Sequence, residues 1–138
     1  MFEKLTSFLP KLQDKEYGKW IIDKENDGTL EHPIHMPFVE YGSIVRDFTK
    51  AAYSFIDAHK EMGLTDYKSI LSEANIEWGM DSMKNADVSS LDGRTVMALI
   101  VGAIRADRFC EGALLGFFED GSIAKWLSRL EETDRETE

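Results

Sequence analysis

The sequence predicts a mainly all-α fold, a compact bundle of about five or six helices around a buried central helix at residues 95–104. Apolar residues recur at the three-and-four spacing of a helix face through most of the chain. One run, from Val96 to Ile104, is apolar on all sides, which is typical of a helix without a solvent face. With 138 residues and no linker-like stretch, we expect a single domain over residues 1–138.

The N-terminal segment predicts a helix that kinks or ends at Pro10, because proline cannot donate the helical hydrogen bond. Residues 17–41 lack helical spacing, and Pro33 and Pro37 exclude a helix there. The residues at 26–28, Asn-Asp-Gly, are a turn signal. We therefore expect a small β-ribbon or an extended segment at 17–41, wrapped over the helices.

One apolar face predicts a helix over residues 44–59, with Ser43 as its N-cap and Gly63 just past its end. A shorter helix is expected over residues 65–74, where a Thr-Asp pair again supplies a capped start. Residues 75–88 predict a loop or a single turn.

Ser89 and Asp92 have the spacing of a capping box, which begins the central helix. Gly102 inside that helix lowers helix propensity by roughly 1 kcal/mol relative to alanine, so we expect another helix to pack closely against it. A final helix is predicted from Ser122 onward. The charged tail at about 132–138 is expected to fray.

The charge balance restricts the class of partner. The chain has 26 acidic and 16 basic residues and a formal net charge of −10. This charge repels phosphate backbones and anionic bilayers, so we expect no nucleic acid and no membrane as partner. A basic protein or a peptide is the partner class that the charge favours.

Three features of the chain lead us to expect a cytoplasmic protein. The apolar run at 96–104 is much shorter than the roughly 20 residues of a membrane-spanning helix. The N-terminus does not have the basic start and apolar run of a signal peptide. The lone Cys110 fits a reducing compartment.

A charged cluster follows the central helix directly and contains Arg105, Asp107, Arg108 and Glu111. It has two interpretations. In the structural one, each carboxylate pairs with an arginine and the cluster closes a corner between two helices. In the functional one, the arginines hold an anion while a carboxylate orients or deprotonates a ligand.

An aromatic group lies on the irregular segment and contains Tyr17, Trp20, Phe38 and Tyr41. Half-exposed aromatic side chains of this kind can form a groove for a peptide or a flat ligand. They can also fix a loop to the core, which is the more common arrangement.

The sequence predicts neither a metal site nor a cofactor. His32 and His35 flank a proline without the usual ligand spacing, and no further histidine or cysteine is near them. Cys110 lies beside arginines that would lower the pKa of its thiol, but no histidine motif accompanies it. We therefore expect Cys110 to be a small core residue rather than a nucleophile.

Several short motifs occur in a recognisable order. They are the run at 104–114 with Phe-Glu-Asp-Gly at 118–121 behind it, the segment at 36–41 and the early segment at 17–20. In this order they resemble a prokaryotic domain family of unknown function, number 6508, over nearly the whole chain. The resemblance implies one shared structural plan and brings no activity, cofactor or catalytic residue.

Three functional hypotheses follow. The first is a non-catalytic interaction or regulatory module, which the acidic surface and the irregular segment favour. The second is a binder of small anions, or a small enzyme, that uses the Arg105, Asp107, Arg108 and Glu111 cluster. The third is an immunity-type protein that neutralises a basic partner, which only charge and size support.

Overall fold

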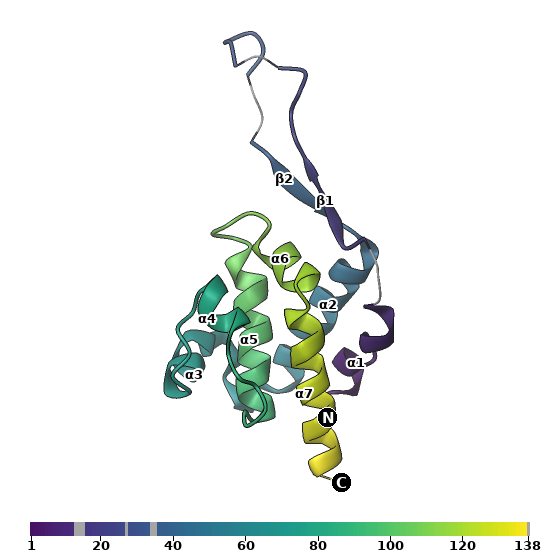
Figure 1. The fold of residues 1–138 in the computed structure, drawn as a ribbon, viewed down its shortest axis with the longest axis vertical. Helices are drawn as coiled ribbons and strands as arrows, with labels where there is room; N and C mark the ends of the chain where they lie inside the picture. The colour runs from purple at the N-terminus through teal and green to yellow at the C-terminus, as the bar shows by residue number, and fades with distance from the viewer. Residues whose placement is uncertain (13–15, 27, 34–35, 138) are drawn as a thin grey trace.

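A computed structural model describes residues 1–12, 16–26, 28–33 and 36–137 (Figure 1). These residues form seven α-helices and one two-stranded antiparallel sheet, so the prediction of a mainly all-α fold with a small β-ribbon is confirmed. The helices are α1 (Glu3–Thr6), α2 (Ser43–Ala58), α3 (Tyr67–Glu73), α4 (Met80–Lys84), α5 (Gly93–Ala106), α6 (Ala113–Glu119) and α7 (Ser122–Glu136). The strands are β1 (Gly18–Ile21) and β2 (Phe38–Tyr41), and short 3₁₀ turns occur at Leu9–Lys11, Lys60–Met62 and Leu64–Asp66.

Helix α5 is the buried centre of the bundle, as predicted. Every residue from Val96 to Ile104 is buried, and α3, α6 and α7 pack around this helix. Its N-cap is Asp92, whose carboxylate accepts a hydrogen bond from the Thr95 N–H at 2.9 Å. The expected capping box does not form, because Asp92 is itself the N-cap and the Ser89 hydroxyl donates to Asp87.

Gly102 allows a close approach on one side of α5, although the neighbour is not a long helix. The indole N–H of Trp78 donates to the Gly102 carbonyl at 3.1 Å. A Cβ on Gly102 would lie only 3.0 Å from the methyl group of Met83, which belongs to the short helix α4. The segment at 75–88 therefore packs on α5 through a tryptophan and a methionine rather than through a regular apolar face.

The C-terminal segment is helical to Glu136, which includes most of the tail at 132–138 that was expected to fray. Thr133 is buried, and the Asp134 carboxylate accepts hydrogen bonds from the N-terminal amine at 3.2 Å and from the Phe2 N–H at 2.9 Å. Figure 1 shows the two ends of the chain side by side. The composition of the tail does not by itself favour a stable helix. Contacts with residues more than a hundred positions away stabilise it.

Strands β1 and β2 form a ribbon that projects from the helical body, rather than wrapping over the helices as expected (Figure 1). We call the described residues between 18 and 41 the arm. Trp20 pairs with Val39 and Ile21 pairs with Phe38. Side chains alternate between the faces of a strand, so Trp20 and Val39 lie on one face of the ribbon and Ile21 and Phe38 on the other.

No helix among the described residues has the length and apolar character needed to cross a membrane. The turn signal at 26–28 includes a residue, Asp27, that lies outside the described ranges.

Candidate functional site at the base of the arm

Asp107 connects the end of α5 to the start of α6 and to the arm. Its Oδ1 atom accepts hydrogen bonds from the Tyr41 hydroxyl at 2.7 Å and from the N–H groups of Gly112 and Leu114, both at 3.1 Å. The first N–H groups of a helix have no partner within the helix, so the carboxylate satisfies donors that would otherwise be unpaired. Asp107 is therefore the residue on which the corner between α5 and α6 is built.

Tyr41 is the last residue of β2 and supplies the matching contact from the arm. Its hydroxyl donates to Asp107 and accepts a hydrogen bond from the Leu115 N–H at 3.1 Å. Burial, and then the neighbouring Asp107 carboxylate, raise the pKa of the Tyr41 phenol well above its ordinary value. The phenol thus remains a hydrogen-bond donor at neutral pH.

Two further contacts fix the arm to the loop between α5 and α6. Glu111 Oε1 accepts a hydrogen bond from the Val39 N–H at 2.8 Å, so a side chain covers part of the outer edge of β2. The Trp20 ring lies over Gly112, where a Cβ would be 2.4 Å from Cζ2 of the indole. Gly112 also has a φ of +88°, a conformation that glycine adopts without strain.

The arginines of the predicted cluster do not pair with these carboxylates. The Arg105 guanidinium lies 6.0 Å from the centre of the Tyr53 ring, and Arg108 is exposed. Neither forms an ion pair with any residue that the structure describes. The four predicted residues are therefore neighbours, but backbone N–H groups and Tyr41 take the place of arginine as partners of the carboxylates.

The predicted aromatic group is distributed over the arm and its base. Tyr17 packs against Phe118, with ring centres 5.2 Å apart, and its hydroxyl donates to the Leu12 carbonyl at 3.0 Å. Trp20 and Tyr41 face the helical body, whereas Phe38 is on the opposite face of the ribbon. Three of the four thus contact the helical body, although Trp20 is still 46% exposed, and Phe38 is 48% exposed on the opposite face.

Apolar side chains lie along the outer part of the arm, and sequence reasoning identified only one of them. Ile22 is 57% exposed, Met36 82% and Phe38 48%. A hollow of about 580 Å³ runs along them and also contacts Asp23, Lys24 and Glu25. We call Ile22, Met36 and Phe38 the outer patch. The sequence did contain a signal for this patch, because large apolar residues occur in a segment that has no helical spacing and therefore no helix face to bury them.

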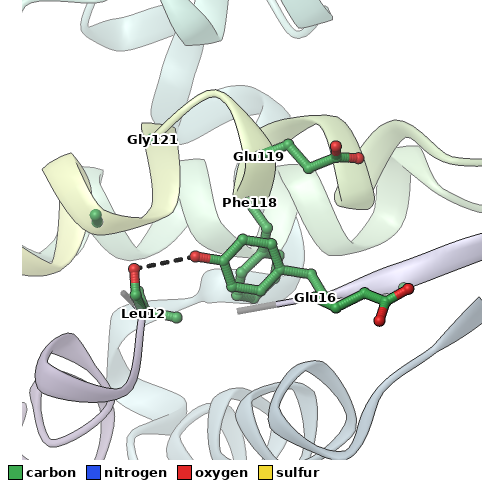
Figure 2. A pocket seen from close by; sticks show the side chains of 8 residues that line it. Leu12, Glu16, Phe118, Glu119 and Gly121 are labelled. Carbon is green, nitrogen blue, oxygen red and sulfur yellow. Dashed lines mark hydrogen bonds between the residues drawn. The ribbon is translucent and has the colours of Figure 1, made fainter. Parts of the chain in front are cut away.

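A separate pocket of about 440 Å³ lies where β1 begins, between the 3₁₀ turn at Leu9–Lys11 and the turn from α6 to α7 (Figure 2). Tyr17 and Phe118 give it an aromatic wall, and Glu16 and Glu119 add two carboxylates, which Figure 2 shows turned to the same side. We call it the acidic pocket. Sequence reasoning assigned Glu119 only to a polar helix end and did not consider Glu16.

A third pocket, of about 420 Å³, adjoins Tyr41 and Asp107 on the side of α2. Arg46 and Lys50 from α2 and Arg108 from the loop after α5 line it. The spacing of Arg46 and Lys50 places them on one face of a helix, a signal that the sequence contained. Their position opposite Arg108 depends on how α2 and α5 pack.

Possible metal ligands are dispersed over the part of the chain that the structure describes. No three histidine, cysteine, aspartate or glutamate side chains gather there in a way that could hold a metal ion. His32 is exposed, and His35 lies outside the described residues. Cys110 is exposed on the loop before α6 and is not the core residue that was expected.

Comparison with known proteins points to a family without an assigned activity. The model of a family of unknown function, DUF6508, matches residues 1–136, which is nearly the whole chain. No curated protein and no solved structure matches the chain. The resemblance inferred from the short motifs is thereby confirmed.

Proposed function

The chain belongs to this family of unknown function, and from its geometry we propose an interaction module whose arm docks a partner segment with apolar and basic side chains. The outer patch is the observation that supports this proposal. Ile22, Met36 and Phe38 are all about half exposed or more, on a ribbon that projects from the body. Burying apolar surface contributes roughly 25 cal/mol per Å², so a partner that covers this patch gains free energy.

The backbone of the arm supports the same mode of binding. A two-stranded ribbon is marginally stable by itself, and this one is fixed to the body only at its base. In the described sheet, β1 pairs with β2 and with no other strand, so its outer edge has no strand beside it. An extended peptide can add to such an edge through backbone hydrogen bonds.

Charge decides the chemistry of the partner. Asp23 and Glu25 adjoin the outer patch together with Lys24. Over its described residues the arm has two further carboxylates, Glu31 and Glu40, and one further lysine, Lys19, so acidic side chains outnumber lysines two to one. The formal net charge of the chain is −10. A second copy of this chain would bring like charges together, whereas a basic segment is attracted and correctly oriented.

The acidic pocket offers a place for one basic side chain of the same partner (Figure 2). A lysine or arginine there would lie against the Tyr17 and Phe118 rings, with Glu16 and Glu119 beside it. Cations are attracted to aromatic faces, and hydrogen bonds to a carboxylate are stronger when the donor is charged.

Synthetic peptides test the proposal directly. A fluorescent peptide that alternates valine and lysine is titrated with the wild-type protein, and a valine–glutamate peptide of equal length is the control for charge. The basic peptide is expected to bind, and the acidic peptide is expected to bind at least about tenfold more weakly. Equal binding of the two peptides would contradict the role assigned to charge.

The variants locate the binding surface. A double variant, Ile22→Ser with Phe38→Ser, removes the outer patch and should weaken binding of the basic peptide about tenfold. Met80→Ser is the matched control, because Met80 is 44% exposed on α4 of the helical body. If Met80→Ser weakens binding as much as the double variant does, the arm is not the docking surface.

A further inference from the structure

The pocket beside Tyr41 and Asp107 combines an apolar floor with a cationic rim. It lies between α2 and the C-terminal end of α5 and has a volume of about 420 Å³. Buried side chains from three helices form the floor, namely Val45 of α2, Ile104 of α5 and Leu114 of α6. Pockets of this size and composition are typical of sites for small organic molecules.

Three cations line the rim, and a fourth is close by. Arg46 and Lys50 extend from successive turns of α2, and Arg108 comes from the loop after α5. The Arg105 guanidinium lies over the ring of Tyr53, which itself lines the pocket. This concentration of positive charge stands out in a chain with 26 acidic and 16 basic residues.

The arginines at this pocket differ from those elsewhere in the protein. The other three each form an ion pair: Arg94 with Glu73, Arg129 with Glu132 and Glu136, and Arg135 with Glu131. Arg46, Arg105 and Arg108 form none with any described residue. Carboxylates are abundant in this chain, so a shortage of partners does not explain why these cations are unpaired.

One carboxylate, that of Asp107, also belongs to the wall of the pocket. Its Oδ1 atom already accepts three hydrogen bonds, from the Tyr41 hydroxyl and two backbone N–H groups. These neutral donors hold the carboxylate in place and it forms no ion pair with a described cation, so the lining carries three positive charges and one negative charge.

We propose that this cationic pocket binds a small organic anion, one that joins a carboxylate or phosphate group to an apolar body about the size of one ring. The guanidinium groups of Arg46 and Arg108 suit the oxygens of a planar carboxylate or a tetrahedral phosphate, because arginine can donate two parallel hydrogen bonds to either group. The apolar body packs on Val45, Ile104 and Leu114. This site is independent of the docking function proposed for the arm, because it uses neither the outer patch nor the acidic pocket.

Phenyl phosphate is the probe, titrated at constant ionic strength into isotope-labelled protein and followed by NMR of the backbone amides. We expect shifts at the amides of Leu114 and Leu115 and a dissociation constant about tenfold lower than that of inorganic phosphate. Benzoate should compete for the same amides. Benzylamine, which has the ring but the opposite charge, should leave those amides unmoved.

Variants of the cations assign the binding. Arg108→Gln and Lys50→Gln should each raise the dissociation constant of phenyl phosphate about fivefold. Neither side chain has an ion pair or hydrogen bond within the described protein, so both variants should fold and melt like the wild type. Lys60→Gln, at an exposed lysine of the 3₁₀ turn Lys60–Met62, is the matched control and should bind as the wild type does.

Three results would overturn the proposal. Phenyl phosphate could leave the Leu114 and Leu115 amides unmoved, it could bind no more tightly than inorganic phosphate, or its affinity for both cation variants could equal its affinity for the wild type. None of these results depends on whether the arm binds a peptide, so the two proposals fail separately.

Discussion

The Tyr41 hydroxyl donates to Asp107 Oδ1 at 2.7 Å, and this hydrogen bond joins the last residue of the arm to the corner of the helical body. The same hydroxyl accepts from the Leu115 N–H, so one group of the arm contacts both sides of the loop between α5 and α6. The stability of the corner and the orientation of the arm are therefore coupled through Tyr41.

Replacing Tyr41 with phenylalanine should lower the free energy of unfolding by about 1–3 kcal/mol, because it leaves the Leu115 N–H without its acceptor and removes one of the three hydrogen bonds to Asp107. Urea unfolding measures the loss. Tyr53→Phe is the matched control, since the Tyr53 hydroxyl makes no hydrogen bond with a described residue. An equal loss in both variants would mean that the hydrogen bonds of Tyr41 contribute nothing to stability.

Tyr41 also predicts how stability changes in alkali. Burial and then Asp107 raise the pKa of its phenol above the ordinary value of 10.0. The unfolded chain therefore loses this proton first, so the stabilisation is complete below pH 10.0 and declines as the pH rises further. Urea midpoints of the wild type should fall between about pH 9 and about pH 11, and those of Tyr41→Phe should fall less. If the urea midpoints of the two proteins fall equally with pH, the pKa of the Tyr41 phenol is not raised by folding.

Asp107 and Arg108 are adjacent in the sequence, yet their removal should have different effects. Asp107→Ala leaves three donors without their acceptor and should cost about 2–4 kcal/mol of unfolding free energy. Arg108→Ala removes an exposed side chain that has no described partner and should change stability by less than about 0.5 kcal/mol. Urea unfolding measures both losses. If Asp107 and Arg108 instead formed a buried ion pair, both variants would be strongly destabilised.

Gly112→Ala should destabilise the base of the arm by more than backbone strain alone. Its φ is +88°, which costs a residue with a Cβ about 1 kcal/mol, and the new atom would overlap the Trp20 ring. Gly121→Ala is the matched control, because its φ is +86° and a Cβ there would have no atom within 4 Å. Thermal unfolding should show the greater loss for Gly112→Ala, with a red shift of tryptophan fluorescence as Trp20, now 46% exposed, becomes more exposed. Equal losses without that shift would mean that the Trp20 contact is not formed in solution.

The sequence predicted those features that local patterns determine. Helix α5 follows from an uninterrupted apolar run, and the ribbon follows from two prolines in a segment without helical spacing. Each of these features depends on residues that are close together in the chain.

Features that depend on distant residues were not predictable in the same way. Tyr41 and Asp107 are 66 positions apart, and Val39 and Glu111 are 72 apart. No local pattern therefore indicates that the two carboxylates bind a phenol and backbone N–H groups rather than arginine. The helical tail depends on hydrogen bonds between Asp134 and the N-terminus. The cationic pocket requires the packing of α2 against α5, which places Arg46 and Lys50 opposite Arg108.

The N-cap of α5 provides the last prediction. The Thr95 N–H donates to the Asp92 carboxylate. Hydrogen bonding by Thr95, first through its side chain and then through its backbone N–H, holds the pKa of Asp92 below its ordinary value of 3.8. A lowered pKa means that the cap stabilises the fold fully above pH 3.8 and loses its effect as the pH falls through the folded value. Asp92→Ala should cost about 1 kcal/mol near neutral pH and progressively less in acid.

Ser89→Ala is the control for this cap, because Ser89 bonds to Asp87 and not to the helix. It should change stability by less than about 0.5 kcal/mol at any pH. Urea unfolding at neutral and acidic pH measures both variants. If Ser89→Ala costs as much as Asp92→Ala, the capping box expected from the spacing would be restored as the start of α5, because both side chains would then be holding the same first turn.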